Sequence, residues 1–144
     1  MLSKQGPRLA ECVKAVPQIA AAVRTSATPI KGTGVEVNGK PVTMLFGLGA
    51  AAATTTADFA IQESDVLADG ADWATITDAE AVQLVTADAN KVGLVDVHTT
   101  KKYARVLHTP GGAGIASGIL GYASLLIYGH ETLPVVNSPV AVIV

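Results

Sequence analysis

From Gly34 onward, apolar and polar residues alternate over short stretches, as they do in half-buried β-strands. Gly, Asn, Asp and Pro separate these stretches at intervals of about ten residues, and no long helical pattern lies between them. The predicted strands cover residues 35–37, 42–48, 58–64, 73–77, 92–97, 102–108 and 123–128, with possible edge strands at 133–136 and 140–144 and either a strand or a helical turn within 79–89. The pattern predicts an all-β chain, an antiparallel β-sandwich of the jelly-roll or immunoglobulin-like type.

Turn residues refine this arrangement. Asn38–Gly39 is the strongest turn signal, because both residue types accept positive φ angles, and it predicts a hairpin between 35–37 and 42–48. Pro41 places the returning strand at a sheet edge or starts it after the proline. A polar loop at 65–72 is predicted to join the next two strands. Three side chains on alternating strands beside such turns are predicted to lie at or near the core: Trp73, Tyr103 and Leu107.

The N-terminal residues follow a different pattern. Apolar residues recur at roughly helical spacing over Arg8–Arg24, Pro17 interrupts this stretch, and residues 25–29 (TSATP) are typical of a linker. The chain is therefore predicted to consist of an N-terminal arm, residues 1–30, which is partly helical, and a β-sandwich domain, residues 31–144.

The apolar side chains of this arm are the candidate protein-contact residues. They are Leu2, Leu9, Val13, Val16, Ile19 and Val23. Burying five such side chains on a neighbouring protein contributes on the order of 7–15 kcal/mol before ordering costs. The arm is predicted to contact a neighbouring copy or another protein, and the alternative is that it folds back onto its own domain.

Composition points to a chain that acts by binding other proteins. Hydrophobic residues make up 49% of the chain and charged residues 15%, which leaves few charges for the surface, so a partner is expected to cover part of it. The formal net charge is −2, and no basic cluster exceeds the pair Lys101–Lys102. Because nucleic-acid binding needs a concentrated basic face, no nucleic-acid partner is expected.

The sequence also bears on the cellular compartment. The single cysteine, Cys12, excludes an internal disulfide and is compatible with assembly in a reducing cytoplasm. The first 23 residues, which Lys4, Arg8 and Pro17 interrupt, do not match a secretory leader. Residues 109–129 lack charge over the length of a membrane span, but their glycines favour a loop followed by a buried strand. No membrane partner is therefore expected.

No motif assembles catalytic chemistry. The glycine-rich segment 110–118 follows a strand, but its spacing fails the dinucleotide fingerprint, because position 117 is Ser. His98, His108 and His130 have no metal-ligand spacing, and Asp65, Asp69 and Asp72 do not match a calcium loop. Since no nucleophile motif is present either, the chain is predicted to be no enzyme, with no catalytic residue, no cofactor and no metal.

Arg105 lies among apolar residues of a predicted strand. A guanidinium in such surroundings needs hydrogen-bond partners to offset its desolvation, which predicts a partly buried Arg105 paired with Glu63 or Asp65. The alternative is an Arg105 that points outward from the solvent face.

Residues 59–65 (FAIQESD) are followed by Asp69–Gly70, Trp73 and Ile76, so a predicted strand ends in a Glu-Ser-Asp turn before a strand that opens with Trp. This pattern resembles that of tailed-bacteriophage virion proteins, in which the turn is Glu/His-Ser-Asp. Residues 102–106 (KYARV) resemble a strand of the same proteins in which an aromatic residue precedes an Arg by two positions. The apolar stretch 123–129 with His130 and Pro134 is similar to their last strand. The resemblance covers residues 58–134, and Val66–Ala68 lengthen the turn relative to that pattern.

This resemblance implies a capsid decoration or cement protein. Such a protein is non-enzymatic, is homo-oligomeric, binds the major capsid protein, bridges capsid subunits and resides in the virion after assembly in the host cytoplasm. The alternative is a carbohydrate-binding or adhesion β-sandwich module, in which Trp73 and Tyr103 would form an exposed stacking platform.

Overall fold

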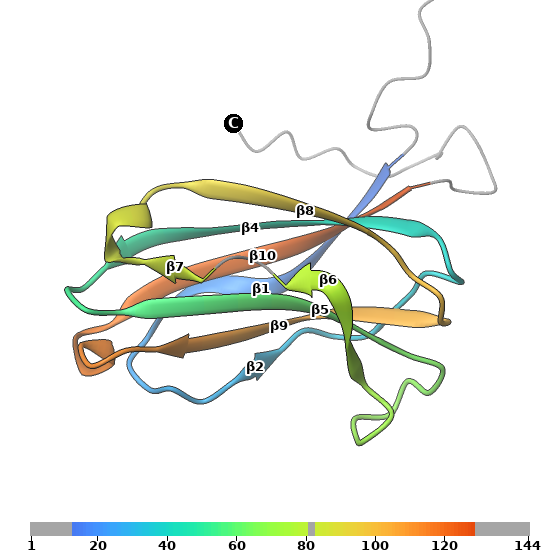
Figure 1. The fold of residues 1–144 in the computed structure, drawn as a ribbon, viewed down its shortest axis with the longest axis horizontal. Coiled ribbons are helices and arrows are strands. Elements are labelled where there is room, and N and C mark those ends of the chain that lie inside the picture. The colour runs from blue at the N-terminus through green and yellow to red at the C-terminus, as the bar shows by residue number, and fades with distance from the viewer. Residues whose placement is uncertain (1–12, 81–82, 129–144) are drawn as a thin grey trace, which may run out of the picture.

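The structure, a computed structural model, describes residues 13–80 and 83–128. Within these ranges the chain forms two antiparallel β-sheets that face each other (Figure 1). Sheet 1 has the strand order β1 (Val13–Arg24), β10 (Ile119–Tyr128), β4 (Pro41–Ala51) and β8 (Val92–His98). Sheet 2 has the order β2 (Ile30–Lys31), β9 (Tyr103–Gly111), β5 (Thr56–Ser64) and β6 (Ala74–Glu80), with β3 (Val35–Glu36) also on β9 and β7 (Leu84–Val85) also on β5. The predicted all-β antiparallel sandwich is confirmed.

The core lies between the two sheets, where the inward-facing residues of each strand meet. Along β10, buried and half-buried residues alternate over the whole strand, so one face of the strand enters the core and the other faces outward. The largest fully buried apolar side chains come from both sheets: Met44, Leu48, Ile119 and Leu125 from sheet 1, and Phe59 and Ile61 from sheet 2. These residues hold the two sheets together by excluding water from the space between them.

The predicted helix over Arg8–Arg24 is wrong for the part that the structure describes. Residues Val13–Arg24 form β1, which pairs along β10 at the edge of sheet 1. The register shifts between Pro17 and Ile19 and again between Ile19 and Ala22. These irregularities break the two-residue alternation of a strand, and the apolar residues then fall at spacings that imitate a helix. From Val13 the predicted arm is therefore an integral strand of the sandwich, and residues 1–12 lie outside the described residues.

The Asn38–Gly39 signal gives the predicted turn but not the predicted hairpin. Asn38 and Gly39 have φ angles of 49° and 70°, as this tight turn requires. However, β3 before the turn pairs with β9 in sheet 2, while β4 after it pairs with β10 and β8 in sheet 1. The turn thus carries the chain from one sheet to the other. Pro41 begins β4, which is an inner strand, at the first position, where no ladder N–H is needed.

The remaining predicted elements are placed as follows. The loop at 65–72 joins β5 to β6, and the segment 79–89 holds the end of β6, β7 and a 3-10 turn, η1 (Thr86–Asp88). The uncharged stretch 109–129 holds the end of β9, a loop with the 3-10 turn η2 (Ile115–Ser117), and the buried strand β10. Among the described residues, no helix has the length and apolar character needed to cross a membrane. The predicted edge strands 133–136 and 140–144 lie outside the described residues.

Candidate interaction surface

The structure separates the predicted contact residues of the N-terminal arm. Ile19 is 3% exposed and belongs to the core of its own domain, and Val16 packs against that core. Val23 is 61% exposed, and Val13 is half-buried at the start of β1. Residues 13–24 thus fold back onto their own domain, as the alternative prediction states. Val23 keeps an exposed apolar surface, and Leu2 and Leu9 lie outside the described residues.

A larger apolar surface lies on the outer face of sheet 1. Val92 and Leu94 on the edge strand β8 are 59% and 62% exposed. Half-buried apolar side chains of the adjacent strands continue this surface: Leu45 on β4 and Leu120, Tyr122 and Leu126 on β10. Asp96 is the only acidic or basic side chain, histidine apart, among the outward-facing residues of β4, β8 and β10. We call this surface the outer apolar face.

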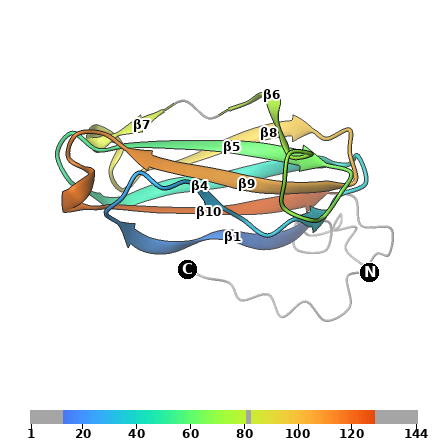
Figure 2. The ribbon, with the colours of Figure 1, turned by 90° about the horizontal axis from the view of Figure 1, so that it is seen from below.

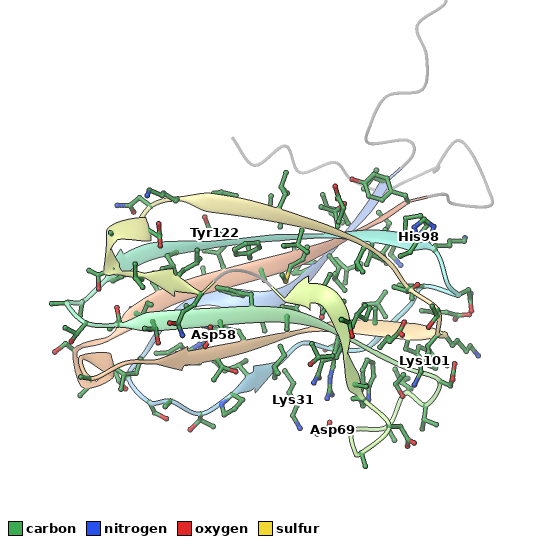
Figure 3. The ribbon with its side chains drawn as sticks, viewed as in Figure 1. Lys31, Asp58, Asp69, His98, Lys101 and Tyr122 are labelled. Carbon is green, nitrogen blue, oxygen red and sulfur yellow. The ribbon has the colours of Figure 1, made fainter. Side chains whose placement is uncertain are left out.

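Gly47 shapes the centre of the outer apolar face. A Cβ atom on Gly47 would lie 2.7 Å from the Cζ atom of Tyr122 on the neighbouring strand, closer than side chains approach. The missing side chain therefore lets the Tyr122 ring lie over β4, and Figure 3 labels Tyr122 beside this strand. The Tyr122 ring therefore lies close against β4 and does not project from the outer apolar face.

A hollow of about 320 Å³ adjoins this face at one end of β4 and β8. In it, the Thr43 hydroxyl donates a hydrogen bond to the Asp96 carboxylate and lies 3.0 Å from the Tyr128 hydroxyl. Because the single Thr43 hydrogen serves the carboxylate, the Tyr128 hydroxyl must donate to Thr43. Thr43 thus links the Asp96 carboxylate and the Tyr128 hydroxyl by hydrogen bonds. The exposed His98 also lines this hollow.

Trp73 and Arg105 anchor the loop 65–72 on the other sheet. Trp73 is 7% exposed, which confirms its predicted place near the core, and its indole N–H donates to the Ala68 carbonyl at 3.0 Å. The Arg105 guanidinium stacks on the Trp73 ring, 4.2 Å from its centroid. Since Trp73 is buried and Arg105 covers its ring, Trp73 does not form the exposed stacking platform that a carbohydrate-binding module requires. Tyr103 and Leu107 are half-buried on β9.

Arg105 is buried and paired as predicted, but its partners differ from the predicted ones. It is 5% exposed, donates from Nε to Gln62 at 2.9 Å, and forms an ion pair with Asp69 at 2.8 Å. Asp69 also binds Lys31 of β2 at 3.0 Å, and Figure 3 shows Lys31 beside Asp69 of the loop. These cations hold the pKa of Asp69 below its usual 3.8, chiefly through the hydrogen bond from Lys31 and then that from Arg105.

The predicted partners of Arg105 bind a different loop. The Glu63 carboxylate accepts hydrogen bonds from the backbone N–H of Thr100 at 2.8 Å and of Lys101 at 3.2 Å. Asp65 accepts one from the backbone N–H of Lys102 at 3.3 Å. Both carboxylates thus satisfy the donors of the β8–β9 turn, so they are not available to Arg105.

The glycine-rich segment 110–118 serves the fold of its own loop. The Gly114 N–H donates to the Thr54 carbonyl at 3.2 Å, and Gly112 has a φ angle of 90° where it passes the same turn. The amides of Ile115, Ser117 and Gly118 donate to carbonyls within the segment, so these amides and that of Gly114 are not available to a phosphate. Among the side chains that the structure describes, no three of His, Cys, Asp or Glu come together to hold a metal ion.

His108 lies in the core, where it stacks on Phe59 with ring centroids 4.3 Å apart. Its Nδ1 lies 3.2 Å from the Asp58 carbonyl oxygen, which can only accept, so Nδ1 carries the proton of the neutral ring. Nε2 has no hydrogen-bond partner among the described residues. Burial lowers the pKa of His108 below its usual 6.5, and the hydrogen bond to Asp58 raises it by less.

The free energy of unfolding is expected to decrease as the pH falls below 6.5. Below this value the unfolded chain binds a proton at His108 that the folded chain does not bind, whereas above it both states are neutral there. For one proton the slope is at most about 1.4 kcal/mol per pH unit. Urea unfolding between about pH 7.5 and pH 5.5 measures it, and His108→Leu is expected to flatten the profile. An equally steep profile in the variant would assign the effect to other groups.

Comparisons with known proteins support the fold class. A scan against protein-family models gave no matching family, and a search of the curated proteins gave no match. The antiparallel β-sandwich is similar to part of a solved structure, that of the PBSX exported protein XepA. The TM-score is 0.57 at 17% sequence identity, and the match covers 93% of this chain and 43% of that chain. This chain therefore spans less than half the length of XepA, and the likeness shows a shared fold.

Proposed function

We propose that this chain is a non-enzymatic structural protein of a phage particle, which binds the capsid and bridges its subunits. The outer apolar face carries the binding part of this proposal. Its exposed Val92 and Leu94 continue into half-buried apolar residues on two further strands, with Asp96 as the one carboxylate. Contiguous apolar surface of this kind is typical of a protein–protein interface.

The phage part of the proposal is supported by the fold and by the sequence resemblance. XepA, which shares the sandwich, is a phage-related PBSX exported protein. The strand and turn pattern of residues 58–134 resembles virion proteins of tailed phages. An apolar sheet face suits binding to a capsid, because each bound copy covers apolar surface that is exposed in the free protein. To bridge capsid subunits, this face would lie across the contact between two of them.

Particles purified from cells that carry the gene test this function. The chain is expected to co-sediment with capsids, and the double substitution Val92→Asp and Leu94→Asp is expected to reduce its retention at least about tenfold, since charges on the face oppose its burial. Leu67→Asp is the matched control, because Leu67 is 53% exposed but lies on the loop of sheet 2. A protein found in the medium and not on particles would contradict the virion assignment.

A further inference from the structure

On the side away from β4, the edge strand β8 has no hydrogen-bonded partner strand among the described residues, although β6 of sheet 2 comes close to it (Figure 2). The other side of β8 pairs with β4, and His98 stands opposite Pro41 in that pairing. Because Pro41 lacks an N–H, this is a non-hydrogen-bonded pair, and such pairs alternate with hydrogen-bonded ones along an antiparallel ladder. The backbone N–H and C=O groups that point away from β4 are therefore those of Val92, Leu94, Asp96 and His98.

The other sheet edges carry features that discourage pairing with a further strand. β1 contains Pro17 and two register shifts, the strands β2, β3 and β7 have only two residues each, and the pairing of β6 with β5 is irregular. In contrast, β8 pairs with β4 in an unbroken register over seven residues, contains no proline, and exposes Val92 and Leu94. Of the edges in residues 13–80 and 83–128, β8 is thus the one prepared to accept another strand.

The surface area that one strand pair buries indicates whether the strand added to β8 comes from a second copy or from the same chain. Two seven-residue edges that pair in a dimer bury well under the roughly 1,000 Å² that a stable interface between separate molecules needs. A strand tethered to the same chain does not need that area, because the tether raises its effective concentration to the millimolar range. The occupant of β8 is therefore sought in the chain itself.

The C-terminal segment has the position and the length to reach β8. Val42 on β4 pairs with Ile127 on one side and Val97 on the other, so β10 ends about 10 Å from the end of β8. The eleven residues 129–139 separate Tyr128 from Val140. They can span up to about 36 Å, which is more than this distance. A chain that returns along the sheet from this end runs antiparallel to β8, and residues 140–144 (VAVIV) have the β-branched composition of a strand.

We propose that residues 140–144 pair with the free side of β8 in the same chain and extend sheet 1 by one strand. This strand satisfies the outward backbone groups of β8 and removes an edge at which copies of the chain would otherwise aggregate. The proposal does not depend on the phage assignment. It leaves the outer apolar face open, because an added strand lies beside β8 in the plane of the sheet.

Amide hydrogen exchange of the intact chain tests this pairing, because amides of β8 that face the added strand can be compared with amides of β8 that face β4. The amides of Gly93, Val95 and Val97 bond to β4 and serve as the internal reference. In the intact chain, the amides of Val92, Leu94 and Asp96 are expected to exchange nearly as slowly as this reference. Val142→Pro, which removes a central N–H of the added strand, is expected to speed their exchange about tenfold or more and to leave the reference unchanged.

Thr132→Pro is the matched control, because it places the same residue in the connecting segment and is expected to leave all these amides unchanged. Fast exchange of the three outward amides in the intact chain would overturn the proposal. Protection that survives Val142→Pro would also overturn it. If the protection increased with protein concentration, the added strand would come from a second copy, and the pairing within one chain would be rejected.

Discussion

Phe59→Ala is expected to lower the free energy of unfolding by about 3–5 kcal/mol. Phe59 is 1% exposed and joins the two sheets, because its ring lies 5.2 Å from that of Phe46 on β4 and stacks on His108 of its own sheet. Its removal leaves a cavity between flat rings on strands whose pairing holds them in place, so the surrounding core cannot close over it. Urea denaturation at neutral pH measures the loss.

Val23→Ala is the control for this substitution. Val23 is 61% exposed on the edge strand β1, so removal of its methyl groups is expected to change the free energy of unfolding by less than about 0.5 kcal/mol. If Phe59→Ala cost no more than this control, Phe59 would not lie at the centre of the contact between the sheets.

Most strands of the sandwich could be predicted from the sequence, because alternation survives wherever the register is regular. Phe59 and Ile61 on β5 alternate with half-buried residues and pair regularly with β9. On β1, two register shifts remove the alternation, and the spacing of Val16, Ile19 and Val23 then favours a helix. A local pattern does not contain the partner strand, so a bulged edge strand escapes such a prediction.

Tertiary partners were harder to predict than elements. Gln62 stands opposite Arg105 in the pairing of β5 with β9, and the acidic residues nearest to Gln62 in sequence are Glu63 and Asp65. The β8–β9 turn uses both of these carboxylates. Asp69 reaches Arg105 because the loop folds back over Trp73, and no sequence pattern specifies that path. The Asn38–Gly39 turn likewise contains no information about which sheet receives the next strand.

The candidate interaction surface was missed for a related reason. Strands β8 and β10 have apolar residues at both odd and even positions, which is typical of a strand covered on both faces. The structure shows one of these faces covered by sheet 2 and the other uncovered, with Val92 and Leu94 exposed. Apolar residues on both faces of a strand in a two-layer sandwich are a signal for such a surface, since only one face can enter the core.

Arg105→Met is expected to lower the free energy of unfolding by about 2 kcal/mol. Methionine keeps the aliphatic contact with Trp73 but loses the stacked charge and the hydrogen bond to Gln62. Because Asp69 stays hydrated at the surface, the substitution leaves no buried charge without a partner, and the loss measures what the guanidinium contributes. Thermal or urea unfolding gives this value, and Trp73 fluorescence reports whether the loop still covers the indole.

Lys31→Met is the control that distinguishes the contribution of the buried Arg105 from that of the exposed Lys31. Lys31 binds the same carboxylate, but its side chain is 47% exposed, so solvent screens the interaction and little stability is expected to be lost. Each of the two variants removes one cation that is paired with Asp69. The two replaced side chains differ in that Arg105 is buried and contacts Trp73, whereas Lys31 is exposed. A larger loss in Arg105→Met, together with a red shift of Trp73 emission that Lys31→Met does not show, is the expected result. Equal stability of the Arg105→Met chain and the unmodified chain would mean that desolvation of the guanidinium offsets all of its contacts, and that the loop is held by Trp73 alone.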